Sequence, residues 1–345
     1  PLAAAQSSKA PVRLETKPFA TLPADFRHPE SLATDPDTGE IYVGSFDSRE
    51  PATARNNQVI RLSPTGRLLA RANLGPTPVT GLAFADGSLY LLNFGASKLQ
   101  RLPARFTTGQ APQDVASFAG LTPPAPPDRV IANPDGSQDR IVYGAAGFPA
   151  INGIAFDTGG NAYVSDSFQG AIYRIAGATT CTSCKVDVLV RDPLLVTTGA
   201  LPFGANGIAI DEAAKLLYVN NAGDGRVLRM PLAGGELDVL ADGVYGADGL
   251  LLHDGLLWVA ANQIDTVVAL DASGLVRARA GRFDGIGSDG APSGLLFPAA
   301  TAVQGDRMLV ANLALPLTPR DGDEWEEQVT RWNLVQFDIP AMASR

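Results

Sequence analysis

The sequence contains few histidines, few cysteines and few basic residues. The two cysteines are too few for a four-cysteine zinc site. The 27 Lys and Arg are outnumbered by 36 Asp and Glu, which gives a net charge of −9 at pH 7. This balance argues against a nucleic-acid partner, because phosphate backbones are bound by Lys and Arg. No apolar run approaches the ~18 residues of a membrane helix. We therefore expect neither a nucleic-acid nor a membrane partner.

Glycine and proline are abundant, with 36 and 26 residues, and they predict many turns and little helix. One unit recurs: an apolar strand, a tight polar turn, and a second strand whose clearest form is Tyr/Trp-Val-x-Asn/Asp. Third and fourth strands usually follow. The six instances of the two-strand unit span residues 30–46, 79–94, 152–168, 206–222, 248–263 and 300–313.

Four short strands repeated radially predict an all-β fold, a six-bladed β-propeller of four-stranded blades. We expect residues 1–11 to be a disordered N-terminal segment and residues 12–345 to form the single propeller domain. Residues 12–16 precede the first unit and are expected to supply the outer strand of the last blade. An N-terminal strand would thereby close the ring and remove its open edges.

Loop lengths favour one face of this propeller as the functional face. The turns between first and second strands are short. The longer stretches mostly join second to third strands, or one blade to the next, on the face where first strands begin. These stretches are residues 47–57, 122–149, 281–298 and 316–328.

Polar residues occupy equivalent positions at the start of four first strands. They are Glu30, Asn152, Asn206 and Asp248, and the last three directly precede glycine. Asn-Gly and Asp-Gly are common turn pairs, which explains one or two instances but not three in register with Glu30. Oxygen donors with two formal negative charges suit Ca²⁺ best, with Mg²⁺, Mn²⁺ or Zn²⁺ as alternatives. Without an ion, Glu30 and Asp248 would repel each other and one pKa would rise.

Further polar and aromatic residues are predicted near this face. Second strands end on Asn or Asp, which could contact substrate or serve only as strand-end turn residues. His28 could line the site or be a turn histidine. Aromatic residues on the same rim suit an apolar or cyclic substrate, or pack between blades. The candidate substrate contacts are His28, Asn93, Asp166, Phe168, Asn221 and Asn262, and the aromatic set is Phe46, Phe94, Phe168, Phe203, Tyr245 and Phe297.

Cys181 and Cys184 form one C-x-x-C, followed by a strand-like segment rather than a helix. We expect a small structural disulfide in an oxidising compartment, with two idle thiols as the alternative. Residues 2–6 are similar to the small-residue end of a cleaved signal peptide. The expected location is periplasmic or secreted, and otherwise cytoplasmic.

The six units with Glu30, Asn152, Asn206 and Asp248 resemble the gluconolactonase/regucalcin (senescence marker protein) family, calcium-dependent propeller hydrolases related to paraoxonases and diisopropyl fluorophosphatase. The resemblance implies that these four residues bind a catalytic cation and that the protein opens a lactone or cleaves an ester. It gives Asp248 a role as general base or nucleophile. A paraoxonase-type histidine pair is not expected, because His253 lies in a first-to-second-strand turn on the opposite face. We expect a monomer with a small-molecule substrate.

Two alternatives to this hydrolase remain open from the sequence. One is a non-catalytic ligand- or protein-binding propeller, as NHL-type repeats form. The other is an enzyme similar to strictosidine synthase, which shares the propeller, works without this metal and uses a glutamate in a late blade. The late blade here offers Glu324, Glu326 and Glu327.

Overall fold

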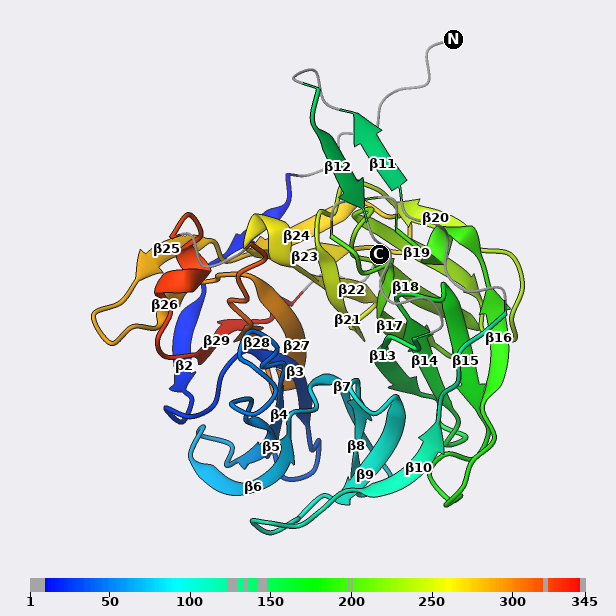
Figure 1. Ribbon diagram of the computed structural model, residues 1–345, viewed down its shortest axis with the longest axis horizontal. Helices are drawn as coiled ribbons and strands as arrows, with labels where there is room; N and C mark the ends of the chain where they lie inside the picture. The colour runs from blue at the N-terminus through cyan, green and yellow to red at the C-terminus, as the bar shows by residue number, and fades with distance from the viewer. Residues whose placement is uncertain are drawn as a thin grey trace.

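The computed structural model shows six antiparallel sheets arranged in a ring (Figure 1), the β-propeller predicted from the sequence. Each of the six blades has four antiparallel strands, and blade five has one more strand at its outer edge. The structure describes residues 10–122, 129–132, 136–141, 148–197, 199, 201–318 and 322–341.

The first three blades run in chain order from the innermost strand to the outermost. Blade one comprises β3 (Pro29–Thr34), β4 (Ile41–Ser45), β5 (Asn57–Leu62) and β6 (Leu68–Gly75). Blade two comprises β7 (Val79–Ala85), β8 (Ser88–Asn93), β9 (Lys98–Pro103) and β10 (Gln113–Ser117). Blade three comprises β13 (Ile151–Phe156), β14 (Ala162–Asp166), β15 (Ala171–Ile175) and β16 (Asp187–Arg191).

The last three blades repeat the plan, and the N-terminal part of the chain joins two of them. Blade four comprises β17 (Ala205–Asp211), β18 (Leu216–Asn221), β19 (Arg226–Pro231) and β20 (Asp238–Ala241). Blade five comprises β21 (Ala247–His253), β22 (Leu256–Ala261), β23 (Thr266–Leu270), β24 (Val276–Ala280) and β1 (Val12–Leu14). Blade six comprises β27 (Pro298–Gln304), β28 (Arg307–Asn312), β29 (Asn333–Asp338) and β2 (Lys17–Thr21).

An N-terminal strand therefore closes the last blade as predicted, but it is a different strand from the one expected. The outer strand of blade six is β2, which pairs antiparallel with β29. The expected segment, residues 12–16, supplies β1 instead, and β1 pairs parallel with β24 of blade five. The short β1 and the longer β2 thus form the outermost strands of two neighbouring blades, so that β24 and β29 are each paired on both edges.

The six first strands surround the axis. Figure 1 shows β3, β7, β13, β17, β21 and β27 nearest the centre, and each contacts the next around the closed ring. The hydrophobic core lies between blades, so that each main cluster combines residues of two neighbouring sheets. Between blades five and six, for example, the rings of Trp258 and Phe337 lie 5.5 Å apart. Each blade therefore depends on both neighbours for burial of its faces.

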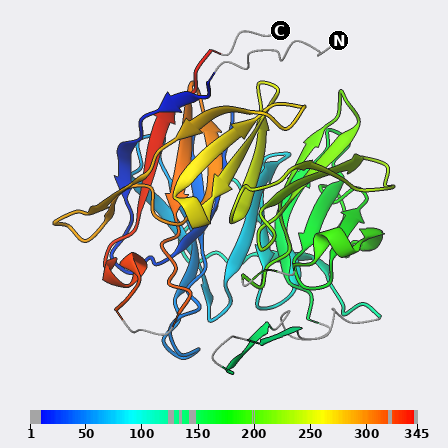
Figure 2. The same ribbon diagram turned by 90° about the horizontal axis from the view of Figure 1, so that it is seen from above.

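The remaining elements are short and lie in the connections. Two hairpins extend from the blades: β11 (Arg129–Ala132) with β12 (Gln138–Ile141), and β25 (Phe283–Ile286) with β26 (Pro292–Gly294). The first belongs to the long 122–149 insertion, and Figure 2 shows it outside the body of the blades. The described residues include three 3₁₀ turns: η1 (Pro193–Leu195), η2 (Asn262–Ile264) and η3 (Trp325–Gln328). Within the described part of the chain, no helix has the length and apolar character to span a membrane.

Candidate metal centre and substrate pocket

A β-bulge breaks the pairing of every first strand near its start. In blades three to five the register shifts between the residues that flank Asn152, Asn206 and Asp248. In blade one the corresponding shift brackets Glu30. A bulge releases its residue from the ladder and re-aims its side chain. The four predicted residues are therefore placed by the same local distortion, once per blade.

One repeated hydrogen bond identifies the equivalent residue in all six blades. The residue that follows each second strand donates its backbone N–H to a carbonyl two residues before the bulge position. The six bonds are Phe46 to His28, Phe94 to Pro78, Ser167 to Ala150, Ala222 to Gly204, Asn262 to Gly246 and Leu313 to Phe297. The six bulge positions are accordingly Glu30, Thr80, Asn152, Asn206, Asp248 and Ala299.

Thr80 is a polar member of this set that the sequence did not reveal. It lies in the bulge of β7, is buried, and donates its hydroxyl to Ile151 O at 2.7 Å. Ala299 is the one apolar member. We call Glu30, Thr80, Asn152, Asn206 and Asp248 the oxygen cup.

The glycines that follow the cup residues have a separate, structural explanation. A Cβ on Gly153 would lie 2.4 Å from Asn206 O, and a Cβ on Gly207 would lie 2.4 Å from Asp248 O. Gly81 and Gly249 approach the carbonyl of the next bulge residue in the same way. Close passage of adjacent first strands therefore requires the glycine. This close passage does not require the preceding Asn or Asp, so the side chains of these residues need a different explanation, which their position in the site provides.

Hydrogen bonds orient the cup side chains. Asn262 Nδ2 donates to Asp248 Oδ2 at 2.9 Å, and Asn152 Nδ2 donates to Ser167 Oγ at 3.2 Å. Asn220 Nδ2 donates to the backbone oxygen of Asp248 at 2.7 Å, which holds the bulge itself. With its amide nitrogen engaged, Asn152 has its carbonyl oxygen left for another partner.

The two carboxyl groups of the cup have raised pKa values. Glu30 and Asp248 are 8% and 5% exposed. Burial, and then the charge of Asp248, raise the pKa of Glu30 well above its ordinary value. Burial also raises the pKa of Asp248 to about 7, against hydrogen bonds from Asn262 and Asn206 that lower it. The mutual effect of two like charges was expected from the sequence.

The oxygen cup separates two cavities on the propeller axis. The axial cavity extends along the first strands and is lined by all six bulge residues. The upper pocket lies on the other side of the cup and has apolar walls. Both are lined by Glu30, Asn152, Asn206 and Asp248, and both include Thr80. The four residues proposed to converge therefore do lie together, at the junction of the two cavities.

The donor set fits a hard divalent cation. Two carboxylates, two carboxamides and a hydroxyl converge there, and the described residues that line the two cavities include no Lys, Arg or His. No side-chain cation thus offsets the two buried negative charges, whereas a divalent ion would. Within the described part of the chain, the cup included, no group of three or more His, Cys, Asp and Glu side chains could hold a metal ion, and the cup adds amide and hydroxyl oxygens to its two carboxylates.

Phenylalanines form a belt above blades one to four. Phe46 and Phe94 have ring centroids 5.5 Å apart, Phe94 and Phe168 6.4 Å, and Phe168 and Phe203 5.5 Å. Phe148, which was not predicted from the sequence, joins the belt at 5.3 Å from Phe94. Phe46, Phe203 and Phe297 reach the upper pocket. Tyr245 does not join them, since it is 62% exposed.

Of the polar residues near the second-strand ends, only Asn262 lines the upper pocket. Asn93 accepts from Ala96 N at 3.1 Å, and Asp166 accepts from Tyr173 Oη at 2.9 Å. Asn221 donates to Leu194 O and Val196 O, both at 2.8 Å. These three thus bind their own blade and its connections. Asn262 differs because it lies one residue later, at the position occupied by Phe46 in blade one.

His28 is buried but lies away from the cup. Its Nδ1 contacts Leu313 O at 3.1 Å, and its ring meets Trp332 edge-on at 4.7 Å. It lines a side cavity with Arg27 and Arg49, and burial lowers its pKa to about 4. The structure therefore gives His28 a packing role next to the strand that carries Glu30.

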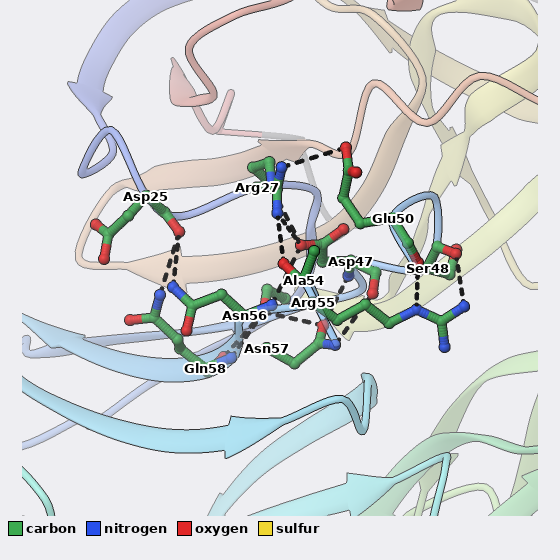
Figure 3. Close-up of polar contacts among 11 residues, drawn as sticks. Asp25, Arg27, Asp47, Ser48, Glu50, Ala54, Arg55, Asn56, Asn57 and Gln58 are labelled. Atoms are coloured by element: carbon green, nitrogen blue, oxygen red, sulfur yellow. Dashed lines mark hydrogen bonds and ion pairs between the residues drawn. The ribbon is translucent and has the colours of Figure 1, made fainter. Parts of the chain in front are cut away.

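An ion pair fixes the loop between β4 and β5 to this same region. Arg27 approaches the buried Asp47 at 2.7 Å, and Asn57 Oδ1 accepts from Asp47 N at 2.7 Å (Figure 3). Arg27 also contacts Glu50 at 3.4 Å. Since Asp47 directly follows Phe46, this network holds one wall of the upper pocket.

The glutamates considered for the late-blade alternative do not reach the cup. Glu324 accepts from Leu317 N at 2.8 Å, Glu327 approaches Arg49 at 3.7 Å, and Glu326 lines two side cavities. Cys181 and Cys184 are joined in a disulfide, before the outer strand β16. His253 ends β21, at the opposite end of the strand from Asp248.

Comparisons with known proteins identify solved structures that have a similar fold. No protein-family model and no curated protein sequence matches this chain. Similar solved structures include regucalcin, a calcium-binding protein from Agrobacterium tumefaciens strain C58, with a TM-score of 0.59 and 16% identity over 95% of this chain and 97% of that one. A luciferin-regenerating enzyme has a TM-score of 0.58 and 14% identity over 92% of each chain. A chain of a nidogen/laminin complex has a TM-score of 0.51 and 17% identity over 73% of this chain and 79% of that one.

The predicted resemblance to regucalcin is confirmed by these comparisons at the level of the fold. At identities of 14–17% the likeness concerns the backbone architecture. This chain is a six-bladed β-propeller with the fold of regucalcin and the luciferin-regenerating enzyme.

Proposed function

We propose that this protein is a cation-dependent hydrolase that opens a lactone or cleaves a related ester. The observation that carries the proposal is the oxygen cup: two buried carboxylates that have no basic residue among the described lining residues, at the floor of a pocket with apolar walls. The fold by itself does not carry it, because a chain of a nidogen/laminin complex has a similar structure. The chemistry comes from the side chains at the bulge positions.

The cup residues have separable roles. Glu30, Asn152, Asn206 and Asp248 would hold the cation, with Thr80 adjacent. Ca²⁺ suits their oxygen atoms best, and when bound it would supply Lewis-acid polarisation of the ester carbonyl. Asp248 would act on water or on the carbonyl itself, and the hydrogen bond at 2.9 Å from Asn262 Nδ2, which orients its carboxylate, supports this role.

The surroundings of the site support a small neutral substrate. The upper pocket is bounded by the loops after β4 and β28 and by the segment before β17, all on the face where first strands begin. We also propose a periplasmic or secreted location, which the disulfide between Cys181 and Cys184 supports.

The test is a panel of lactones and esters assayed with the purified protein, before and after chelation. Chelation should abolish hydrolysis, and Ca²⁺ should restore it better than Mg²⁺, Mn²⁺ or Zn²⁺. Asp248→Asn should lower kcat/KM by roughly 100-fold or more. The matched control is Asp254→Asn, whose exposed side chain lies in the turn after the opposite end of β21. Hydrolysis that survives both chelation and Asp248→Asn would refute the proposal.

A further inference from the structure

The upper pocket separates polar from apolar groups by depth. Its polar lining is confined to the oxygen cup and Asn262, at the floor. Its walls are apolar, and the described lining residues include no hydroxyl beyond Thr80 and no Lys, Arg or His. The wall residues are Phe46, Leu201, Phe203, Phe297, Leu313, Leu315 and Leu317.

These walls come from segments far apart in the chain and are backed by further apolar packing. Phe46 follows β4, Phe203 precedes β17, and Phe297 precedes β27. Phe46, Phe297 and Leu313 are buried in one hydrophobic cluster, against which Leu315 packs. Phe203 rests on Phe168 with ring centroids 5.5 Å apart. The apolar surface is therefore a built part of the propeller rather than a few isolated exposed residues.

Such a wall distinguishes substrates by what surrounds their carbonyl group. A polyhydroxylated lactone would place hydroxyls against Leu and Phe, where they lose water and find no partner. Each such hydroxyl weakens binding by roughly ten-fold. An anionic substituent would meet no basic group and would lie near two carboxylates. Each methylene of an alkyl substituent, by contrast, should strengthen binding about four-fold while it remains in contact with the wall.

We propose that this pocket selects uncharged lactones or esters with an apolar alkyl or aryl substituent and discriminates against polyhydroxylated and anionic ones. The choice of reaction rests on the proposed function of the cup, whereas the choice of substituent rests on the wall alone. The reacting carbonyl lies at the floor, near Asp248, and the substituent lies along Leu201, Leu315 and Phe203.

The kinetic test compares γ-butyrolactone, γ-hexalactone, γ-octalactone and γ-decalactone with glucono-1,5-lactone. Values of kcat/KM should rise with chain length by about four-fold per methylene until the wall is covered. The sugar lactone should fall at least about 100-fold below γ-octalactone. Leu315→Asn should lower the ratio of γ-decalactone to γ-butyrolactone kcat/KM about ten-fold, whereas the volume-conserving Leu315→Met should keep it. Leu275→Asn, at a position 50% exposed, is the surface control.

A binding test separates this inference from the proposed reaction. Cyclopentanones with 2-alkyl chains of increasing length carry the carbonyl and the substituent but cannot be hydrolysed. Their Kd, measured by calorimetry with Ca²⁺ present, should fall about four-fold per methylene, and Leu315→Asn should flatten that dependence. If Leu315→Asn does not fold by circular dichroism, Leu201→Asn tests the same wall.

The outcomes are distinguishable. Lactones opened without chain-length preference, or glucono-1,5-lactone opened best, would overturn the inference and leave the hydrolase intact. Chain-length-dependent ketone binding without hydrolysis of any lactone or ester would support the apolar pocket and refute the hydrolase. Ketone binding that is independent of chain length would overturn the inference whatever the activity.

Discussion

Replacing Asp248 by Asn should stabilise the cation-free protein while it abolishes the response to cation. Asp248 is 5% exposed, and burial raises its pKa from 3.8 to about 7. Between these values the folded state binds more protons than the unfolded state, so stability falls as pH rises from about 4 to about 7. Each pKa unit of difference is worth ~1.36 kcal/mol, so the ionisation of Asp248 alone removes about 4 kcal/mol of stability across this window.

The carboxamide introduced by Asp248→Asn does not ionise and relieves the repulsion on Glu30, so the variant should lack this loss. At pH 8 in chelator, Asp248→Asn should exceed the wild type by up to about 4 kcal/mol in free energy of unfolding. Unfolding entropies of ~2.1 cal/mol/K per residue convert this to about 6 °C in Tm for a chain of this length. In excess Ca²⁺ the wild type should recover most or all of this difference, because a ligand stabilises it by about 2.7 kcal/mol at 100 times its Kd and by about 4.1 kcal/mol at 1,000 times its Kd.

The assay is thermal unfolding from pH 4 to pH 8, in chelator and in millimolar Ca²⁺, with Asp254→Asn as the matched surface control. A structural role for Asp248 predicts that the variant is less stable in both conditions. A variant less stable than the wild type at pH 8 in chelator, or one with the same pH dependence, would refute the reasoning.

Three further predictions concern the cup and its support. Glu30→Gln retains a carbonyl oxygen but loses a charge, and calorimetry should show Ca²⁺ affinity reduced at least about ten-fold; unchanged affinity would remove Glu30 from the cation site. Gly207→Ala, whose Cβ would lie 2.4 Å from Asp248 O, should destabilise the protein by roughly 2 kcal/mol or more, whereas Gly159→Ala, which meets only side-chain atoms at 3.2 Å or beyond, should cost less than about 1 kcal/mol. Burial lowers the pKa of His28 to about 4. The folded state therefore binds fewer protons at this residue than the unfolded state, and its free energy of unfolding should fall by about 3 kcal/mol as pH falls from 6.5 to 4. His28→Asn, in chemical denaturation across this range, should lack that loss, and an unchanged pH slope would contradict it.

The repeat and the four charged or amide members of the cup could be predicted from the sequence, because each is marked by its place at a strand start and three of them precede glycine. Thr80 was missed for a local reason. The sequence pattern puts the start of the second unit at Val79, and the bulge in β7 makes the next residue, Thr80, the inward-facing one. Alternation along a strand cannot locate such a residue, since a shift of one position reverses the face.

A difference of one residue also decides which of the Asn and Asp residues near the second-strand ends reach the cup. Asn93, Asp166 and Asn221 lie at the last strand position and bond to their own blades, whereas Asn262 lies one position later and reaches Asp248. The sequence shows similar residues at these strand ends, and only the backbone conformation distinguishes them. The expectation that residues 12–16 close blade six was wrong, because β1 and β2 both precede the first unit and both carry apolar residues, so that the sequence does not distinguish them.

The pairing of β2 with β29 has a consequence for biosynthesis. Lys17 lies opposite Gln336 and Thr21 opposite Asn333, so blade six cannot be completed until β29 has left the ribosome, more than 300 residues after β2. Closing so long a loop is entropically costly and slow compared with forming local hairpins. Glu30 lies in β3, which directly follows β2 in the sequence, whereas Asp248 lies in blade five and is synthesised much later. The two carboxylates are thus brought together when the ring of blades closes, and a cation held by these residues would stabilise the closed ring.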